Sequence, residues 1–200
     1  MHIVYFDLET KYSADEVGGW SNIEDMGMSV GILWDSSDSQ FHIYLENQTQ
    51  DLLDHCKNAD LVVGFNHIGF DFRVVAGVLR ANRDERQRLY TELVELNNFD
   101  MLVEIKKALG HRLKLDDIAR PTLGVGKSAD GLLALKWYKE GKLDKIIEYC
   151  KDDVAVTRDV YQYALEHHQL SYNSRTGIKT VKLNWSQEKP KKEIEQMSLF

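Results

Sequence analysis

The segment YFDLET, residues 5–10, places two acidic residues at the end of a predicted strand. The alternation over residues 3–9 predicts one face with Ile3, Tyr5, Asp7 and Glu9 and another with Val4, Phe6 and Leu8. Asp7 and Glu9 are therefore expected to project side by side from an otherwise apolar strand. Carboxylates are costly in such surroundings unless something pairs with them. The segment thus predicts both a buried sheet and a site at the end of one strand.

The segments around this strand predict an α/β fold. SVGILWD (29–35) and QFHIYLE (40–46) flank the turn SSDS and are typical of an antiparallel hairpin. LVVGFN (61–66) is a continuous apolar run, as in a strand buried on both faces, and NFDML indicates a short fifth strand. Helices are expected at 48–58, 70–81, 84–96 and about 143–166. This order predicts a mixed sheet of about five strands, one of them antiparallel, flanked by helices.

The chain has 200 residues, which suggests one domain with an appendage. We expect a domain over residues 1–168 and a hairpin extension over 169–186, turning near Thr176 and Gly177. Residues 187–200 contain all but the first residue of the charged stretch SQEKPKKEIE (186–195) and end in QMSLF. They predict a flexible tail.

Composition is that of a soluble globular protein, with 43% hydrophobic and 28% charged residues. No apolar run approaches the roughly 18 residues of a membrane span, and the N-terminus shows no signal peptide. Cys56 and Cys150 have no metal-type spacing, so we expect reduced thiols in a cytoplasmic protein.

The net charge of −7 is unlike that of most nucleic-acid binders. However, a metal-dependent site concentrates acids, and basic residues do cluster in two places. One is KKALGHRLK (106–114), and the other contains Arg73, Arg80, Arg83, Arg86 and Arg88. Either cluster fits a solvated helix face or a phosphate-binding surface.

Asp71 lies in NHIGFDF, directly after the 61–66 strand and at the start of a predicted helix. Sites in α/β sheets gather at the carboxyl ends of strands, which favours a functional carboxylate here. An acid near a helix N-terminus is also favourable with the helix dipole, so a purely structural role stays open.

The helix over 143–166 adds a fourth acid. Its predicted core-facing stripe consists of Ile146, Cys150, Val154, Thr157 and Tyr161. Tyr149 and Asp153 are four residues apart, so they share a face at the edge of the buried side, whereas Asp152 is expected in solvent. No lysine or arginine lies one turn beyond Asp153, at positions 156 and 157. Like charges in a small volume need cations, and hard oxygen ligands favour Mg²⁺ or Mn²⁺.

Three motifs now form a recognisable set: FDLET, NHIGFD and YCKDD. In this order and spacing they resemble the exonuclease motifs of the DEDD superfamily of 3′–5′ exonucleases, which have a ribonuclease H-like fold. The stretch FDMLVEIKKALGHRLKLDDIARPTLGVGKSADG is most similar to the YprB-like ribonuclease H-like group, related to the exonuclease domain of family B DNA polymerases. The resemblance covers residues 1–165.

The resemblance implies that Asp7, Glu9, Asp71 and Asp153 bind two divalent cations, Mg²⁺ or Mn²⁺. It also implies the tyrosine subtype, DEDDy, because Tyr149 fits Tyr-x-x-x-Asp and the alternative histidine position holds Glu148. Tyr149 would then orient the nucleophilic water. The implied reaction is hydrolysis of terminal phosphodiesters from a 3′ end.

Several residues outside these three motifs are candidates for substrate contacts or for a structural role. Trp20, Asn66 and Phe70 are candidates to hold the terminal nucleotide, and each is equally compatible with packing. Asp100 is interpreted as structural. GVGKS (124–128) is not a P-loop, because the pattern needs glycine five residues before Gly126, where the chain has Pro121. Lys127 remains a candidate contact to the substrate backbone.

The terminal QMSLF resembles the Gln-x-x-Leu-Phe peptide that bacterial replication proteins insert into the sliding clamp. The resemblance implies clamp binding by Gln196, Leu199 and Phe200; the alternative is a tail that packs on its own domain. DNA is therefore favoured over RNA as the substrate. An RNA-trimming exoribonuclease and a non-catalytic nucleic-acid or clamp adaptor are the alternative functions.

Overall fold

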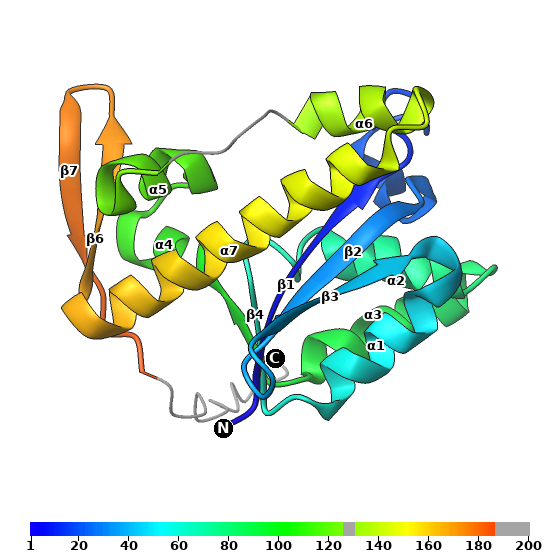
Figure 1. Cartoon of the computed structure of the whole chain (residues 1–200), viewed down its shortest axis with the longest axis horizontal. Coiled ribbons are helices and arrows are strands. Elements are labelled where there is room, and N and C mark those ends of the chain that lie inside the picture. The colour runs from blue at the N-terminus through cyan, green and yellow to red at the C-terminus, as the bar shows by residue number, and fades with distance from the viewer. Residues whose placement is uncertain (126–130, 187–200) are drawn as a thin grey trace, which may run out of the picture.

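A computed structural model describes residues 1–125 and 131–186 (Figure 1). Its main sheet has the strand order β3-β2-β1-β4-β5. The strands are β1 (Ile3–Thr10), β2 (Met28–Asp35), β3 (Gln40–Leu45), β4 (Leu61–Gly64) and β5 (Asn98–Asp100). β2 runs antiparallel to both of its neighbours, and the other pairings are parallel. The predicted mixed five-stranded sheet with one antiparallel strand is confirmed.

Helices cover both faces of this sheet (Figure 1). One face carries α1 (Thr49–Asn58), α2 (Asp71–Leu79) and α3 (Arg83–Glu95), with the short 3₁₀ segments η1 (Trp20–Asp25) and η2 (Glu46–Gln48). The long α7 (Leu143–His167) crosses the other face, which also carries α4 (Met101–Leu109), α5 (Leu115–Leu123) and α6 (Gly131–Lys139). Within the described ranges, none of these helices is both long and apolar enough to cross a membrane.

The alternation along β1 divides the core in two. Ile3 and Tyr5 belong to the cluster beneath α7, whereas Val4, Phe6 and Leu8 belong to the cluster beneath α1, α2 and α3. All five side chains are buried. The face of β1 that carries Asp7 and Glu9 is therefore the face that α7 covers, because side chains alternate along a strand.

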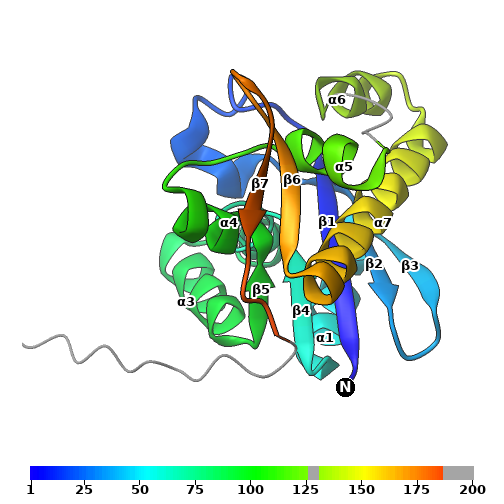
Figure 2. The ribbon, with the colours of Figure 1, turned by 90° about the vertical axis from the view of Figure 1, so that its left-hand side faces the viewer.

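A second, two-stranded sheet follows α7. β6 (Gln169–Ser174) and β7 (Gly177–Lys182) form a hairpin that lies alongside α5 and α4 (Figure 2). The backbone N–H of Ser171 donates to the hydroxyl of Thr122, and this hydroxyl donates back to the carbonyl of Ser171. Trp185, beyond the hairpin, stacks on Tyr161 of α7. The segment 169–186 thus packs on the same core as the residues before it.

Some predicted features lie outside the described residues. These are Lys127 and the clamp motif residues Gln196, Leu199 and Phe200. Gly124, the first residue of GVGKS, ends a helix: it closes α5 with a left-handed φ of 73°. Pro121 lies within that helix, as expected for a segment that is not a P-loop.

Candidate functional site

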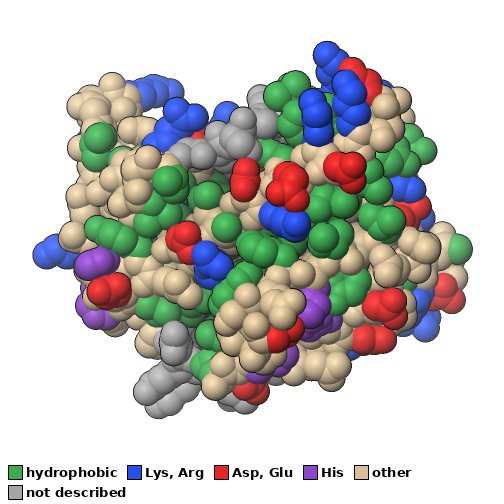
Figure 3. Space-filling model, in the orientation of Figure 1, with side chains coloured by type: hydrophobic (Ala, Val, Ile, Leu, Met, Phe, Trp, Pro, Cys, Tyr) green, Lys and Arg blue, Asp and Glu red, His purple; other side chains and the backbone are tan. Residues whose placement is uncertain are grey.

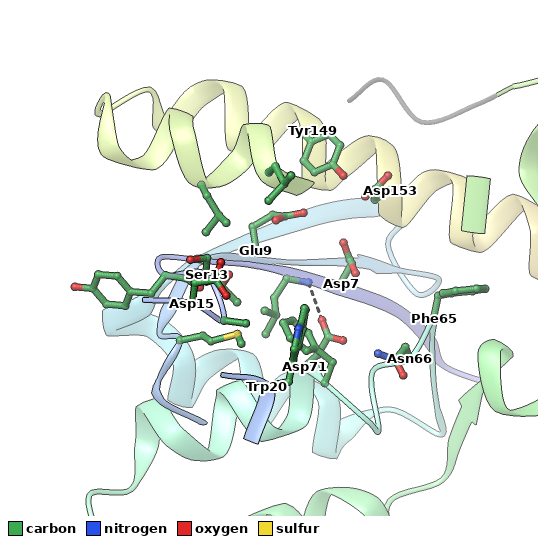
Figure 4. A pocket seen from close by; sticks show the side chains of 18 residues that line it. Asp7, Glu9, Ser13, Asp15, Trp20, Phe65, Asn66, Asp71, Tyr149 and Asp153 are labelled. Atoms are coloured by element: carbon green, nitrogen blue, oxygen red, sulfur yellow. Dashed lines mark hydrogen bonds between the residues drawn. The ribbon is translucent and has the colours of Figure 1, made fainter. Parts of the chain in front are cut away.

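Three carboxylates from two elements come together on the α7 side of β1 (Figure 4). Asp7 and Glu9 extend from β1, and Asp153 extends from α7. One carboxylate oxygen of each lies within 4.8 Å of the other two. Two positions on one strand and one on a helix therefore form a group that could hold a metal ion.

α7 supplies this site through a face that is more deeply buried than expected. The predicted stripe of Ile146, Cys150, Val154, Thr157 and Tyr161 is buried throughout. Tyr149 and Asp153, predicted at the edge of the buried side, are each only 3% exposed. α6 accounts for part of this difference, since the ring of its Trp137 packs 6.2 Å from the ring of Tyr149. Asp152 is exposed, as its helical position predicts.

Asp71 approaches the pocket from the opposite face of the sheet. β4 stops pairing with β1 at Phe6 and Gly64, while β1 continues to Thr10. Past that point, the backbone N–H of Leu8 donates to Oδ1 of Asp71 at 3.1 Å, which fixes this carboxylate against β1. Asp71 is buried and begins α2, where its charge is also favourable with the helix dipole. It lines the same pocket but is not a member of the three-carboxylate group.

Burial, together with the negative charge of these acids, raises the pKa of the neighbouring thiol of Cys150. Burial raises the pKa of the Cys150 thiol well above its ordinary value, and the nearby carboxylates raise it further. These are Asp7, Glu9, Asp153 and Asp71. Cys150 Sγ lies 3.6 Å from the carbonyl oxygen of Asp7, directly beneath the site. The thiol therefore stays protonated, and the four acids act on one small region.

The loop after β4 is held by Asp100. Its Oδ1 accepts from the backbone N–H of Asn66 at 2.9 Å, and its Oδ2 accepts from that of Ile68 at 3.1 Å. Asp100 also accepts from Leu102 at the start of α4. The expected structural role of Asp100 is confirmed, and it fixes a loop in which Asn66 adopts a left-handed φ of 70°.

These elements enclose a pocket of about 480 Å³. Its acidic lining residues are Asp7, Glu9, Asp15, Asp71 and Asp153. Its aromatic lining residues are Tyr12, Trp20, Phe65, Phe70 and Tyr149. No lysine or arginine is among the described residues that line it. A polyanion could approach five carboxylates only if cations neutralised them.

The nucleotide-binding candidates lie at this pocket. Trp20, Asn66 and Phe70 all line it, and the Trp20 and Phe70 rings are 6.4 Å apart. Trp20 is 71% exposed, which is unusual for a residue whose role is packing. Asn66 accepts a hydrogen bond through its Oδ1 from Arg112 at 2.9 Å. The side chain of Arg112, in the basic stretch 106–114, is thus directed to the rim of the pocket.

The other basic cluster serves the fold. Arg73 pairs with Glu24 and lies over the ring of Tyr90, 4.4 Å from its centre. Arg86 pairs with Asp25 at 2.6 Å. These contacts join α2 and α3 to η1, so Arg73 and Arg86 stabilise the fold, a role that neither interpretation of this cluster from the sequence included.

Sequence reasoning missed several pocket residues. They are Tyr12, Ser13, Asp15, Phe65, Leu132 and Leu135. The first three lie between β1 and η1, where no periodicity or motif marks them. The two leucines lie on α6, where Leu132 is exposed and Leu135 half-buried, and leucines in such positions are too common to signal a site.

A family model described as the RNase_H superfamily matches residues 4–165. No curated protein matches the chain in sequence. Among solved structures, the chain is similar to the family B DNA polymerase from the hyperthermophilic archaeon Pyrobaculum calidifontis, at 15% identity and a TM-score of 0.61. The alignment covers 82% of this chain and 24% of the polymerase, so the chain corresponds to about a quarter of that protein's length.

Proposed function

The chain belongs to the RNase H superfamily, and on that premise we propose that it is a metal-dependent 3′–5′ exonuclease. Its substrate would be DNA, single-stranded or at a 3′ end, and its products nucleoside monophosphates. The observation that carries the proposal is the pocket lined by five carboxylates and, among the described residues, by no basic side chain. A pocket of this charge is suited to cations, and through them to an anionic substrate.

The donor set fits divalent metal ions. Asp7, Glu9 and Asp153 would hold one ion, since their carboxylate oxygens already lie within 4.8 Å of one another. Asp71 would support a second ion with Asp7. Carboxylate oxygens are hard ligands, which favours Mg²⁺ or Mn²⁺. When bound, such ions would activate a water molecule and stabilise the charge that develops on the departing 3′ oxygen.

The protein's own groups would position the reactants. Tyr149 is buried on the same face of α7 as Asp153, and Figure 4 shows its ring directed to the site above Glu9 and Asp7. Its hydroxyl would orient the attacking water. Glu148, at the position that carries histidine in the other subtype, pairs with Lys151 and has a largely exposed side chain. This placement supports the tyrosine subtype.

The rim of the pocket would bind the terminal nucleotide. We expect the base to stack on Trp20 or Phe70, with Asn66 as a hydrogen-bonding partner and Lys127 as a contact to the backbone. A second hollow of about 430 Å³ shares Ser13, Leu132 and Leu135 with the pocket and continues along α6. It would give the preceding nucleotides a path away from the site.

We further propose that the C-terminal segment tethers the enzyme to a sliding clamp. QMSLF is the last segment of the chain, after a charged stretch with the composition of a flexible tail. Gln196, Leu199 and Phe200 would enter the clamp pocket. A tether of this kind would raise the local concentration of the nuclease at a 3′ end without a new catalytic contact.

End-labelled substrates test the proposed reaction. The protein and Mn²⁺ are incubated with single-stranded DNA, duplex DNA and RNA, each labelled at the 5′ or the 3′ end, with Asp153→Asn as the inactive control. A 3′–5′ exonuclease releases labelled mononucleotide at once from 3′-labelled DNA and produces a shortening ladder from 5′-labelled DNA. Immediate mononucleotide release from the 5′ label would contradict the polarity. Cleavage of RNA alone would instead indicate an exoribonuclease, and binding without cleavage would indicate an adaptor.

A further inference from the structure

A second group of metal-type side chains lies at the opposite end of β1 from the acidic pocket. It surrounds Asp35, the last residue of β2, which pairs with Val4 in the register of the sheet. Val4 and Glu9 are five strand positions apart, roughly 17 Å at about 3.3 Å per residue. The group consists of His2, Asp35, Asp38, His42 and His55. Figure 3 shows histidine and acidic side chains gathered at the lower edge of this face, near β3 and α1 of Figure 1.

Asp35 is a buried carboxylate held in one orientation. Its Oδ1 accepts from the backbone N–H of Ser37 at 2.7 Å, and its Oδ2 accepts from Nε2 of His55 at 2.6 Å. Burial by itself would raise the pKa of the Asp35 carboxyl group, but the hydrogen bonds from Ser37 and His55 hold that pKa well below its ordinary value. These contacts fix the carboxylate so that Oδ1 faces His2 and Oδ2 faces His55.

His2 brings a buried ring nitrogen to the same carboxylate. Its Nε2 lies 2.8 Å from Oδ1 of Asp35. This close contact helps to hold the pKa of the Asp35 carboxyl group low, although its geometry departs from that of an aligned hydrogen bond. Buried polar atoms are nearly always satisfied by protein, water or an ion. His2 and His55 both direct a ring nitrogen at Asp35, so a cation bound to this carboxylate would reach both nitrogens.

His55 is oriented as metal-binding histidines are. Its second ring nitrogen, Nδ1, lies 2.7 Å from the hydroxyl of Tyr44, which fixes the ring so that Nε2 faces Asp35. Histidine ligands of metals commonly have such a partner on their other nitrogen. The ring of His42 packs edge-to-face on His55, 4.8 Å away, and its Nε2 lies 2.9 Å from Asp38. Asp35, Asp38 and His42 form a second group that could hold a metal ion, and it shares Asp35 with the group of His2, Asp35 and His55.

We propose that His2, Asp35 and His55 bind a divalent transition-metal ion of the zinc class, with Asp38 and His42 available to complete its coordination. Bonds of about 2.0–2.1 Å to a tetrahedral ion place ligand atoms about 3.3 Å apart. In the present structure Asp35 lies 2.8 Å from Nε2 of His2 and 2.6 Å from Nε2 of His55. These distances would open by less than about 1 Å as bonds to the metal replace the hydrogen bond from His55 to Asp35. Imidazole nitrogens favour this class of ion over Mg²⁺. The ion would tie the start of β1 to the end of β2 and to α1.

Cobalt binding tests the site, and it does not depend on nuclease activity. The full chain, without a histidine tag, is titrated with Co²⁺ in excess Mg²⁺ and followed by visible absorption, because Mg²⁺ competes for the carboxylate pocket but poorly for imidazoles. We expect one equivalent of Co²⁺ to bind with a ligand-field spectrum that Zn²⁺ abolishes. Asp7→Asn, in the acidic pocket, and His167→Ala, an exposed histidine at the end of α7, should leave this binding unchanged.

The variants separate the metal site from a purely hydrogen-bonded network. His2→Ala is the decisive one, because His2 precedes β1 and its removal leaves the hydrogen bond between Asp35 and His55 intact. It should weaken Co²⁺ binding at least about 100-fold while circular dichroism shows a folded protein. Tyr44→Phe should weaken binding by about 10- to 100-fold, as expected for loss of a ligand's hydrogen-bond partner. An absent spectrum, undiminished binding in His2→Ala, or binding lost in Asp7→Asn would overturn the proposal.

Discussion

Asp152 and Asp153 are neighbours in the sequence, yet Asp153 lies buried at the acidic pocket and Asp152 lies in solvent. The difference comes from the roughly 100° that each residue turns around a helix. Asp153 shares its face with Tyr149 and approaches Asp7 and Glu9. Two residues with the same side chain therefore provide an internal comparison for the proposed site.

Asp153→Asn should lower nuclease activity at least about 100-fold, whereas Asp152→Asn should change it less than about twofold. Mutation of a residue that only hydrogen-bonds to a metal ligand lowers metal affinity or activity by about 10- to 100-fold. Loss of a ligand itself should lower activity more. Removing one charge from a crowded acidic site also relieves repulsion, so in EDTA the melting temperature of Asp153→Asn should equal or exceed that of the wild type. Rates and melting curves of both variants check this. If Asp152→Asn is the inactive one, the assignment is wrong.

Activity should require Mg²⁺ or Mn²⁺ and cease in EDTA, because the five pocket carboxylates would otherwise repel a phosphodiester. Ca²⁺ should support substrate binding but little cleavage, since its looser coordination positions ligands poorly. The measurement is product formation in each ion after EDTA treatment, beside a binding assay. Robust cleavage in EDTA would rule out the metal assignment.

Tyr149→Phe should lower turnover by about 10- to 100-fold while leaving DNA and metal affinity largely intact. The ring still packs near Trp137, and only the hydroxyl that orients water is lost. Small positioning losses at a reacting atom have effects of this size. Single-turnover rates measure the effect on the chemical step, and binding isotherms measure the effect on DNA and metal affinity. Unchanged turnover would leave Tyr149 as a core residue only.

Trp20→Ala should weaken binding of single-stranded DNA by about 1–3 kcal/mol, roughly 5- to 150-fold, the usual loss for an aromatic that stacks on one base. Its ring is largely exposed, so the melting temperature should not change. Ile178→Ala, a similarly exposed position on β7, is the matched control for both measurements. A fall in melting temperature with unchanged DNA affinity would show that Trp20 serves packing.

Leu199→Ala with Phe200→Ala should abolish binding to a purified sliding clamp and leave hydrolysis of short free oligonucleotides unchanged. In so short a peptide, affinity depends on a few buried anchors. Met197→Ala with Ser198→Ala, at the two variable positions of the motif, is the control and should keep clamp binding. Undiminished clamp affinity in the first variant, or a loss of its thermal stability, would contradict the clamp interpretation.

Local periodicity determined much of the fold. The alternation along residues 3–9 predicted two buried faces, and β1 indeed divides the core between them. The stripe on α7 likewise predicted which side of that helix is buried, because a regular backbone converts spacing directly into direction. The same reasoning separated Asp153 from Asp152.

Tertiary structure alone decided how the elements meet. No spacing in the sequence shows that β4 ends at Gly64 and leaves the N–H of Leu8 to Asp71, or that Tyr12 and Leu132 line one pocket. The group around Asp35 was missed for the same reason, since His2 and His55 are separated by 53 positions (55 − 2) and meet only when β1, β2 and α1 pack together. Periodicity fixes the direction of a side chain on its own element, whereas proximity between elements depends on packing that no local pattern records.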